Sequence, residues 1–167
     1  MILARFRSAY ERFLEWVAIV LMVVLATEVT VGVVFRYAGH SLVWYDEVAT
    51  ILLAWVTFYG SALAVLKHAH MGVPEIVRML PAGSRVAVTV LAQLCTLAFF
   101  VLLAWVGYSI LEVLATDRLV SLPQVPVACA NSVIPISAVL IVVGQLLVFP
   151  EVVREARREA GRAEESA

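Results

Sequence analysis

Four long apolar runs restrict the fold of this chain more than any other feature of its sequence. They cover residues 16–35, 48–66, 86–111 and, counted from the turn at Pro126, 127–149. About 20 helical residues cross the hydrocarbon core of a bilayer, and each run is close to or above that length. The sequence therefore predicts an all-α integral membrane protein with four transmembrane helices.

The composition agrees with a membrane protein and gives no sign of nucleic-acid binding. Apolar residues make up 63% of the 167 residues and charged residues only 15%, whereas an average soluble domain has about 25% charged residues. The formal net charge is −1, so the chain has no basic excess that would attract nucleic acid. We expect the lipid bilayer to be the main partner of its surface.

Basic residues predict how the spans are oriented. Ten of the twelve lysine and arginine residues lie in the N-terminal segment, in the loop between the second and third runs, or in the C-terminal tail. The other two loops contain one each, Arg36 and Arg118. Because cytoplasmic loops are enriched in lysine and arginine, both termini are expected to be cytoplasmic. The first run exceeds the 7–15 residues of a signal peptide's apolar region, so we expect it to be retained.

The loop between the second and third runs predicts a short amphipathic helix. Pro74 suits the first turn of a helix, and the apolar residues are spaced as one helical face: Val73, Ile76, Val77 and Leu80. An amphipathic helix flanked by basic residues is expected to lie at the membrane interface. A surface helix packed on the protein's own cytoplasmic face is the alternative.

A proline and a change in composition mark the fourth run and its end. Pro135 removes one backbone donor and should kink the fourth helix near Asn131. After residue 150 the sequence becomes charged and Ala-rich. We therefore divide the chain into a four-helix membrane domain, residues 1–150, and a charged cytoplasmic tail, residues 151–167. The tail is expected to be a frayed helix that leads into disorder.

Glu28 is the one acidic residue well inside an apolar run. Insertion scales assign a cost of about 2.5–3.5 kcal/mol to a charged residue at the centre of a span, so such an acid is a functional candidate. It would carry a proton or bind a cation. A protonated or hydrogen-bonded Glu28 that faces another helix or a partner subunit is the alternative.

The histidines do not indicate a metal or haem site. His40, His68 and His70 all lie outside the four runs, whereas a haem held inside a membrane needs histidine ligands within helices. His40 could be combined with Asp46 and Glu47, but three ligands on a loop without cysteine match a metal site poorly. The usual nucleophile and nucleotide motifs are absent, so we expect neither an enzyme nor a cofactor in this chain.

Polar and aromatic residues gather in "FRYAGHSLVWYDEVA", which joins the first two runs. Aromatic residues at both edges, among them Tyr37 and Trp44, are typical of a membrane interface. Asp46 and Glu47 open the second helix, where carboxylates favour the positive end of the helix dipole. We expect Arg36 to contact one of these two acids in a partly exposed ion pair worth at most about 1 kcal/mol. The segment is therefore interpreted as a structural hinge and a candidate partner surface.

The order and spacing of several motifs resemble the small membrane subunit of TRAP (tripartite ATP-independent periplasmic) transporters, a DctQ-like family. The resemblance covers about residues 36–147 and implies structural or interface roles for the residues that carry it. These motifs are Arg36–Tyr37 after the first span, Trp44 before the acidic pair Asp46–Glu47, "AWVTFYGSALAV" in the second span, "HMGV" from His70, and the "IP" that ends at Pro135.

The resemblance implies an accessory role in uptake. In such a system a periplasmic substrate-binding protein captures an organic acid, and a large multi-span membrane subunit moves it together with sodium. The small subunit supports the large one as a scaffold in the bacterial inner membrane. Sodium would then bind to the large partner subunit, and the transported substrate is not identified by this sequence.

Two other functions remain open from the residues alone. One is a self-sufficient dimeric exporter of lipophilic cations that is coupled to protons through Glu28. The predicted interfacial helix, the long outer loop and the charged tail exceed what such a short exporter needs. The other is a membrane organiser or assembly factor without transport activity.

Overall fold

The computed structural model describes residues 2–40, 42–67 and 82–165, and every named element in this part of the chain is a helix. The elements are α1 (Ile2–Tyr37), α2 (Tyr45–Leu66), α4 (Ala82–Leu114), α5 (Val127–Asn131) and α6 (Val133–Glu165). Four helical stretches are long and apolar enough to cross a membrane: Arg5–Tyr37, Tyr45–Leu66, Ser84–Leu114 and Val127–Arg158. The predicted all-α architecture with four such helices is therefore confirmed.

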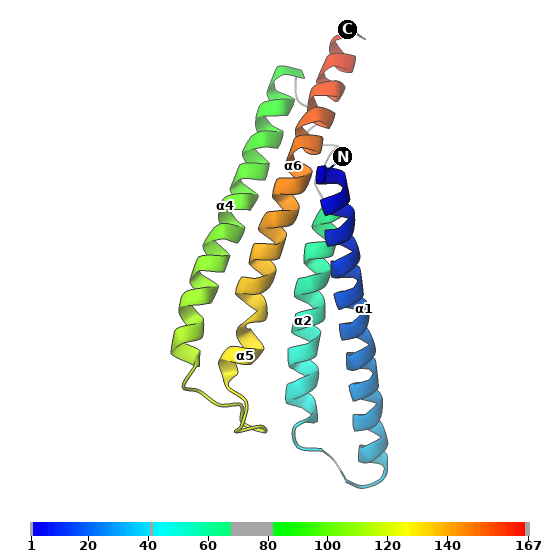
Figure 1. The fold of residues 1–167 in the computed structure, drawn as a ribbon, viewed down its shortest axis with the longest axis vertical. Coiled ribbons are helices and arrows are strands. Elements are labelled where there is room, and N and C mark those ends of the chain that lie inside the picture. The colour runs from blue at the N-terminus through cyan, green and yellow to red at the C-terminus, as the bar shows by residue number, and fades with distance from the viewer. Residues whose placement is uncertain (1, 41, 68–81, 166–167) are drawn as a thin grey trace.

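The long helices stand side by side in the order α4, α6, α2 and α1 (Figure 1). α6 packs against both α4 and α2, and α1 packs against α2. The α1–α2 loop and the α4–α5 loop lie at one end of the structure, which we call the loop end (Figure 1). Both chain termini lie towards the opposite end, which we call the terminal end. The assignment of the terminal end to the cytoplasm stays a prediction.

Helix α6 forms the centre of the described structure. In its most apolar stretch 44% of the residues are buried, against 11% or less in the other three membrane helices. Ile141 and Val148 of α6 share one buried cluster with Leu66 of α2 and Leu14 of α1. By contrast, α1 and α4 expose many large apolar side chains on their outward faces. An extended apolar surface of this kind suits contact with lipid or with another membrane protein.

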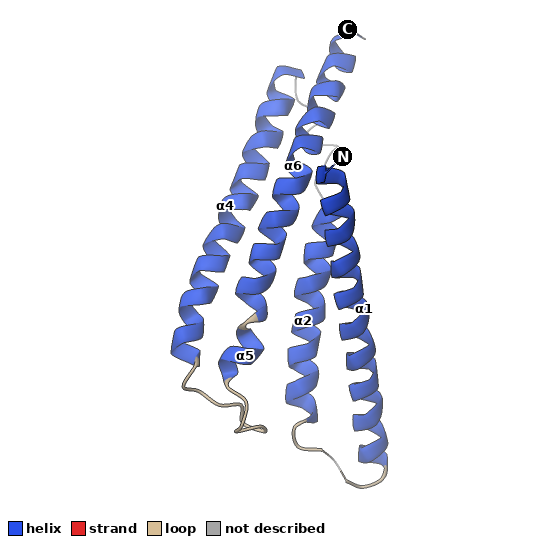
Figure 2. Ribbon diagram, viewed as in Figure 1, coloured by secondary structure: helices blue, strands red, loops and turns tan. Residues whose placement is uncertain are grey.

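The fourth membrane helix is interrupted where the sequence predicts a kink. α5 ends at Asn131, Ser132 separates the two helices, and α6 begins at Val133 (Figure 2). Pro135 has no N–H to donate to the carbonyl of Asn131, so the helical hydrogen-bond ladder is broken at this point. Pro135 itself is buried, and a methyl group added at Gly107 of α4 would lie 3.2 Å from its Cδ. The interruption therefore lies at the contact between α4 and α6.

The C-terminal segment differs from its sequence-based expectation. α6 continues through Pro150 to Glu165 without a break, whereas the charged tail was expected to fray. Alanine, glutamate and arginine are strong helix formers, and this explains why the helix persists after the apolar stretch ends. His70 and the predicted amphipathic helix of residues 73–80 lie outside the described residues.

Polar contacts tie three helices together at the terminal end. The guanidinium of Arg7 on α1 donates to the carboxylate of Glu151 on α6 at 2.6 Å and to the carbonyl of Leu66 at 3.1 Å. Lys67, which follows α2, donates to Glu15 of α1, and this hydrogen bond raises the pKa of Lys67 above its usual value. These contacts hold α1, α2 and α6 in one arrangement.

Replacing Arg7 with glutamine should lower the free energy of unfolding by about 1 kcal/mol, because the ion pair is partly exposed and one carbonyl also loses its donor. Unfolding of the purified chain in mixed detergent micelles measures the change. Arg12→Gln is the matched control, since Arg12 is an exposed arginine of the same helix. An equal loss in both variants would show that the Arg7 contacts add nothing.

Candidate functional site

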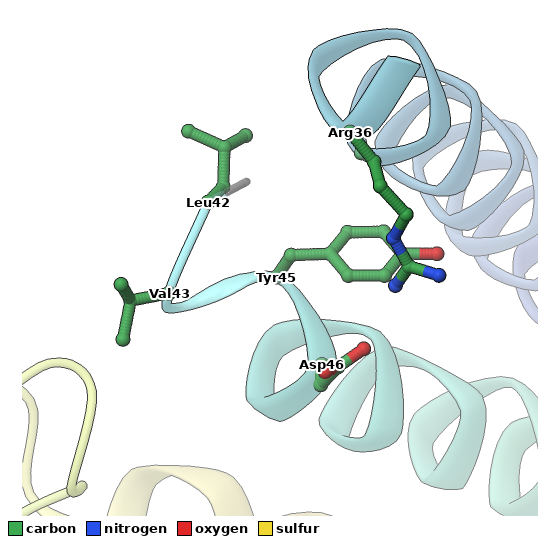
Figure 3. Close-up of a pocket in the computed structure, with 6 residues that line it drawn as sticks. Arg36, Leu42, Val43, Tyr45 and Asp46 are labelled. Carbon is green, nitrogen blue, oxygen red and sulfur yellow. The ribbon is translucent and has the colours of Figure 1, made fainter. Parts of the chain in front are cut away.

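The main candidate site is a pocket at the loop end, between α1 and α2 (Figure 3). It has a volume of about 350 Å³, near the lower limit of the size range of small-molecule sites. Its lining combines one cation, one anion, one aromatic ring and two apolar loop residues. The lining residues are Gly32 and Arg36 of α1, Leu42 and Val43 of the loop, and Tyr45 and Asp46 of α2.

Close packing between Gly32 and Tyr45 shapes this pocket. Gly32 is buried, and a methyl group added there would overlap the ring of Tyr45. The absence of a side chain therefore lets α1 and the first turn of α2 approach each other. Gly39 has a φ of 80°, a left-handed conformation that glycine adopts without strain, and it permits the chain to reverse after α1.

The predicted ion pair between Arg36 and the acidic pair is wrong. Within the described part of the chain, no nitrogen–oxygen contact of 4.0 Å or less joins Arg36 to Asp46 or Glu47. The guanidinium lies instead over the ring of Tyr45, 6.0 Å from its centroid (Figure 3). Tyr45 reaches across to Gly32 and so presents its ring to Arg36, where a cation–π contact is favourable.

Glu47 binds the backbone of the distant α4–α5 loop. Its carboxylate accepts hydrogen bonds from the amide N–H of Val120 at 3.2 Å and from that of Ser121 at 2.8 Å. The loop is also closed on itself, because the amide of Leu119 donates to Val125 and that of Val127 donates to Asp117. Glu47 therefore fastens the start of α2 to a folded loop of the other half of the chain. We call the two hydrogen bonds that Glu47 accepts from Val120 and Ser121 the Glu47 clasp.

The aromatic residues of the loop end have different surroundings. Tyr37 is 91% exposed at the end of α1, and Trp44 lies immediately before α2 and is 36% exposed. About three turns into α2, the indole N–H of Trp55 donates to the carbonyl of Ala130 at 3.1 Å and so joins α2 to α5. The place of Tyr37 and Trp44 in a membrane-interface belt stays a prediction.

The structure does not combine His40 with the acidic pair. The imidazole Nδ1 of His40 contacts the carbonyl of Ala38 at 3.0 Å, within its own loop. Among the residues that the structure describes, no group of three or more histidine, cysteine, aspartate and glutamate side chains could hold a metal ion. The arrangement therefore gives no support to the weak metal alternative at His40, Asp46 and Glu47.

Glu28 lies one helical turn before Gly32 on α1. Both oxygens of its carboxyl group are hidden from solvent and have no hydrogen-bond partner among the described residues. The described residues therefore supply no hydrogen-bond partner to Glu28, and both alternatives, a proton- or cation-binding acid and a protonated or hydrogen-bonded acid that faces another helix or a partner subunit, stay predictions.

The fold and the loop end define a multi-pass membrane protein, held together by apolar packing and by clusters of polar contacts at its two ends. Residues 25–155 match the family described as "Tripartite ATP-independent periplasmic transporters, DctQ component". The match covers more than half of the chain, so the chain belongs to this family, and the resemblance found in its motifs is confirmed. Members of the family are transport components and not enzymes.

A curated relative is similar over part of the chain. It is the C4-dicarboxylate TRAP transporter small permease protein DctQ of Vibrio cholerae serotype O1. The two sequences are 28% identical over 88 residues, which cover 52% of this chain and 38% of the relative. The aligned part is thus less than two thirds of the relative's length.

Proposed function

We propose that this chain is the scaffold subunit of a sodium-coupled, binding-protein-dependent TRAP transporter for organic acids, and that it supports a large transport subunit. Membership of the DctQ family supports the transporter class. The observation that carries the scaffold role is that charged side chains at both ends of the structure stabilise the fold of this chain itself. Glu47 at the loop end and Arg7 at the terminal end both bind groups of this same chain.

The apolar runs contain no group that would balance the charge of an organic acid. No lysine or arginine occurs in any of the four runs. The buried side-chain oxygens without a hydrogen bond in the described residues belong to Glu28 on α1 and to Gln145 on α6. A carboxylate and an amide oxygen do not attract an anion, so the organic acid is assigned to the large partner subunit. The assignment of sodium to that same subunit rests on the family resemblance.

The self-sufficient exporter is not favoured. Membership of the DctQ family supports a subunit of a larger system, and the matched residues include Glu28 together with all of α2. Glu28 is also accompanied by no second acid in the four runs. A role for Glu28 in packing against a partner helix is the more economical interpretation.

The predicted orientation indicates which partner each surface would meet. With both termini in the cytoplasm of a bacterium, the loop end faces the periplasm. The α4–α5 loop then presents Val120, which is 92% exposed, to the side where a periplasmic substrate-binding protein would dock. The outward apolar faces of α1 and α4 are available to lipid and to the large membrane subunit.

Reconstitution tests this function. Vesicles that contain the large subunit, this chain, a loaded binding protein and an inward sodium gradient should accumulate the organic acid. Without this chain, uptake should fall close to the level of protein-free vesicles, because the large subunit loses its support. A C4-dicarboxylate is the first acid to test, since the relative's name includes it. A sugar acid and a 2-oxo acid complete the panel.

Two controls make this result specific. Replacing sodium with potassium should abolish uptake in the complete system, which separates coupling from leakage. Adding this chain alone to vesicles should give no uptake of any acid in the panel. Full uptake by the large subunit and binding protein without this chain would contradict the scaffold role.

A further inference from the structure

Arg36 and Asp46 are opposite charges that line one pocket without neutralising each other. Both residues are exposed, and no ion pair of 4.0 Å or less joins them within the described residues. The guanidinium contacts the Tyr45 ring, while the nearby carboxylate of Glu47 is occupied by the α4–α5 loop. The pocket of about 350 Å³ therefore offers a separate cation and anion to one ligand.

Exposed apolar side chains lie beyond this pocket on both helices. On α1, Val29, Val33 and Arg36 are spaced i, i+4 and i+7, so they share one face, and both valines are exposed. On α2, Asp46 and Leu53 are also seven residues apart, and Leu53 is exposed. Arg36 therefore lies at the end of an apolar strip of α1, and Asp46 lies two turns from an exposed leucine of α2.

The level of the pocket matches the headgroup region of a bilayer. The pocket lies where the apolar helix α1 ends and where α2 begins. Exposed aromatic residues, Tyr37 and Trp44, flank it, and such residues concentrate at the membrane–water interface. A ligand with a charged head and apolar chains would place its head in the pocket and its chains against the apolar side chains of the two helices.

We propose that this pocket binds the phosphoethanolamine headgroup of a phospholipid. Arg36 donates to the phosphate, for which the planar guanidinium is well suited. Asp46 accepts a hydrogen bond from the primary ammonium group. The acyl chains lie against Val29 and Val33 of α1 and Leu53 of α2. A zwitterionic headgroup fits because the pocket supplies one charge of each sign, and the site extends the chain's function beyond support of a partner subunit.

Lipid titrations of the purified full-length chain, followed by native mass spectrometry, test the site. The probes are phosphatidylethanolamine, phosphatidylcholine and phosphatidylglycerol with identical acyl chains. We expect phosphatidylethanolamine to bind about threefold to fivefold more tightly than the other two, as suits exposed charged contacts. Phosphatidylcholine has no N–H to donate to Asp46, and phosphatidylglycerol has no cation.

Charge-removing variants assign the two contacts. Arg36→Gln should weaken binding of all three lipids about fivefold, because each has a phosphate, whereas Arg36→Lys should retain part of the affinity. Asp46→Asn should remove the preference for phosphatidylethanolamine over phosphatidylcholine. The matched controls are Arg118→Gln and Asp117→Asn, which remove exposed charges from the loop end outside the pocket. They should bind all three lipids as the wild type does.

Several outcomes would overturn the proposal. Unchanged lipid binding in Arg36→Gln and Asp46→Asn would mean that lipids bind elsewhere. Equal losses in the Arg118→Gln and Asp117→Asn controls would indicate non-specific surface attraction. Soluble phosphoethanolamine that bound as tightly as the phospholipid would identify the ligand as a free phosphate ester. Melting temperatures of all variants show whether each one is folded. If Arg36→Gln does not fold, Arg36→Lys still tests the contact with the phosphate.

Discussion

Replacing Gly32 with alanine should destabilise the α1–α2 pair by about 1–3 kcal/mol, the usual cost of overpacking a filled contact. A methyl group at this position would overlap the ring of Tyr45, so either the ring or the helix must move. The free energy of unfolding in mixed detergent micelles measures the loss. Gly60→Ala on α2 is the matched control, because a methyl group there would meet nothing within 4 Å. It should be neutral or stabilising, since alanine is the better helix former.

A second substitution separates this clash from a general effect on the helix. In a Tyr45→Ala background the added methyl group has room, so Gly32→Ala should then cost little or should stabilise. The coupling between the two sites, measured as a double-mutant cycle, should exceed about 1 kcal/mol. The same loss in both backgrounds would rule out the Tyr45 ring as its cause.

Replacing Glu47 with alanine should release the α4–α5 loop from α2. The amides of Val120 and Ser121 lose their acceptor, so their hydrogen exchange should accelerate by about tenfold or more. Glu47→Gln should give an intermediate result, because the amide keeps one oxygen that accepts a hydrogen bond. Amide exchange followed by mass spectrometry or NMR in detergent measures both variants.

The adjacent acid provides the control for the Glu47 clasp. Asp46→Asn changes the neighbouring carboxylate, which has no contact with the α4–α5 loop among the described hydrogen bonds and ion pairs, so exchange in the loop should be unchanged. Rapid exchange at Val120 and Ser121 already in the wild type would show that the clasp does not form. In the reconstituted transporter, Glu47→Ala should also weaken docking of the binding protein if the loop is part of its docking surface.

The membrane helices were predictable because their apolar runs are long and uninterrupted. Helix ends were less so, since helix formation does not stop where the apolar residues stop. α1 begins at Ile2, well before Trp16, and α6 runs to Glu165, well beyond Phe149. Both extensions are rich in residues with high helix propensity. Hydropathy locates the part of a helix that fits in lipid, but local propensity and tertiary contacts set its true length.

The loop-end site was predictable in location but not in its contacts. The sequence places Arg36 and the acidic pair on facing ends of one hairpin, and the structure brings Arg36 and Asp46 to one pocket. The sequence could not reveal that Glu47 would bind two backbone amides 73 and 74 residues away, because every residue type except proline offers such an amide. The packing of Tyr45 on Gly32 was missed because a lone glycine in an apolar helix has many explanations.

The order of the helices in space has a consequence for how the chain is made. α4 finds its main described partner, α6, only in the segment that follows it in the sequence, whereas α1 and α2 are partners from the moment both exist. During synthesis the first hairpin can therefore assemble early, while α4 waits in the bilayer with its inner face uncovered. When α6 leaves the ribosome it joins α4 to the first hairpin, and quality control of this protein is expected to act at that step.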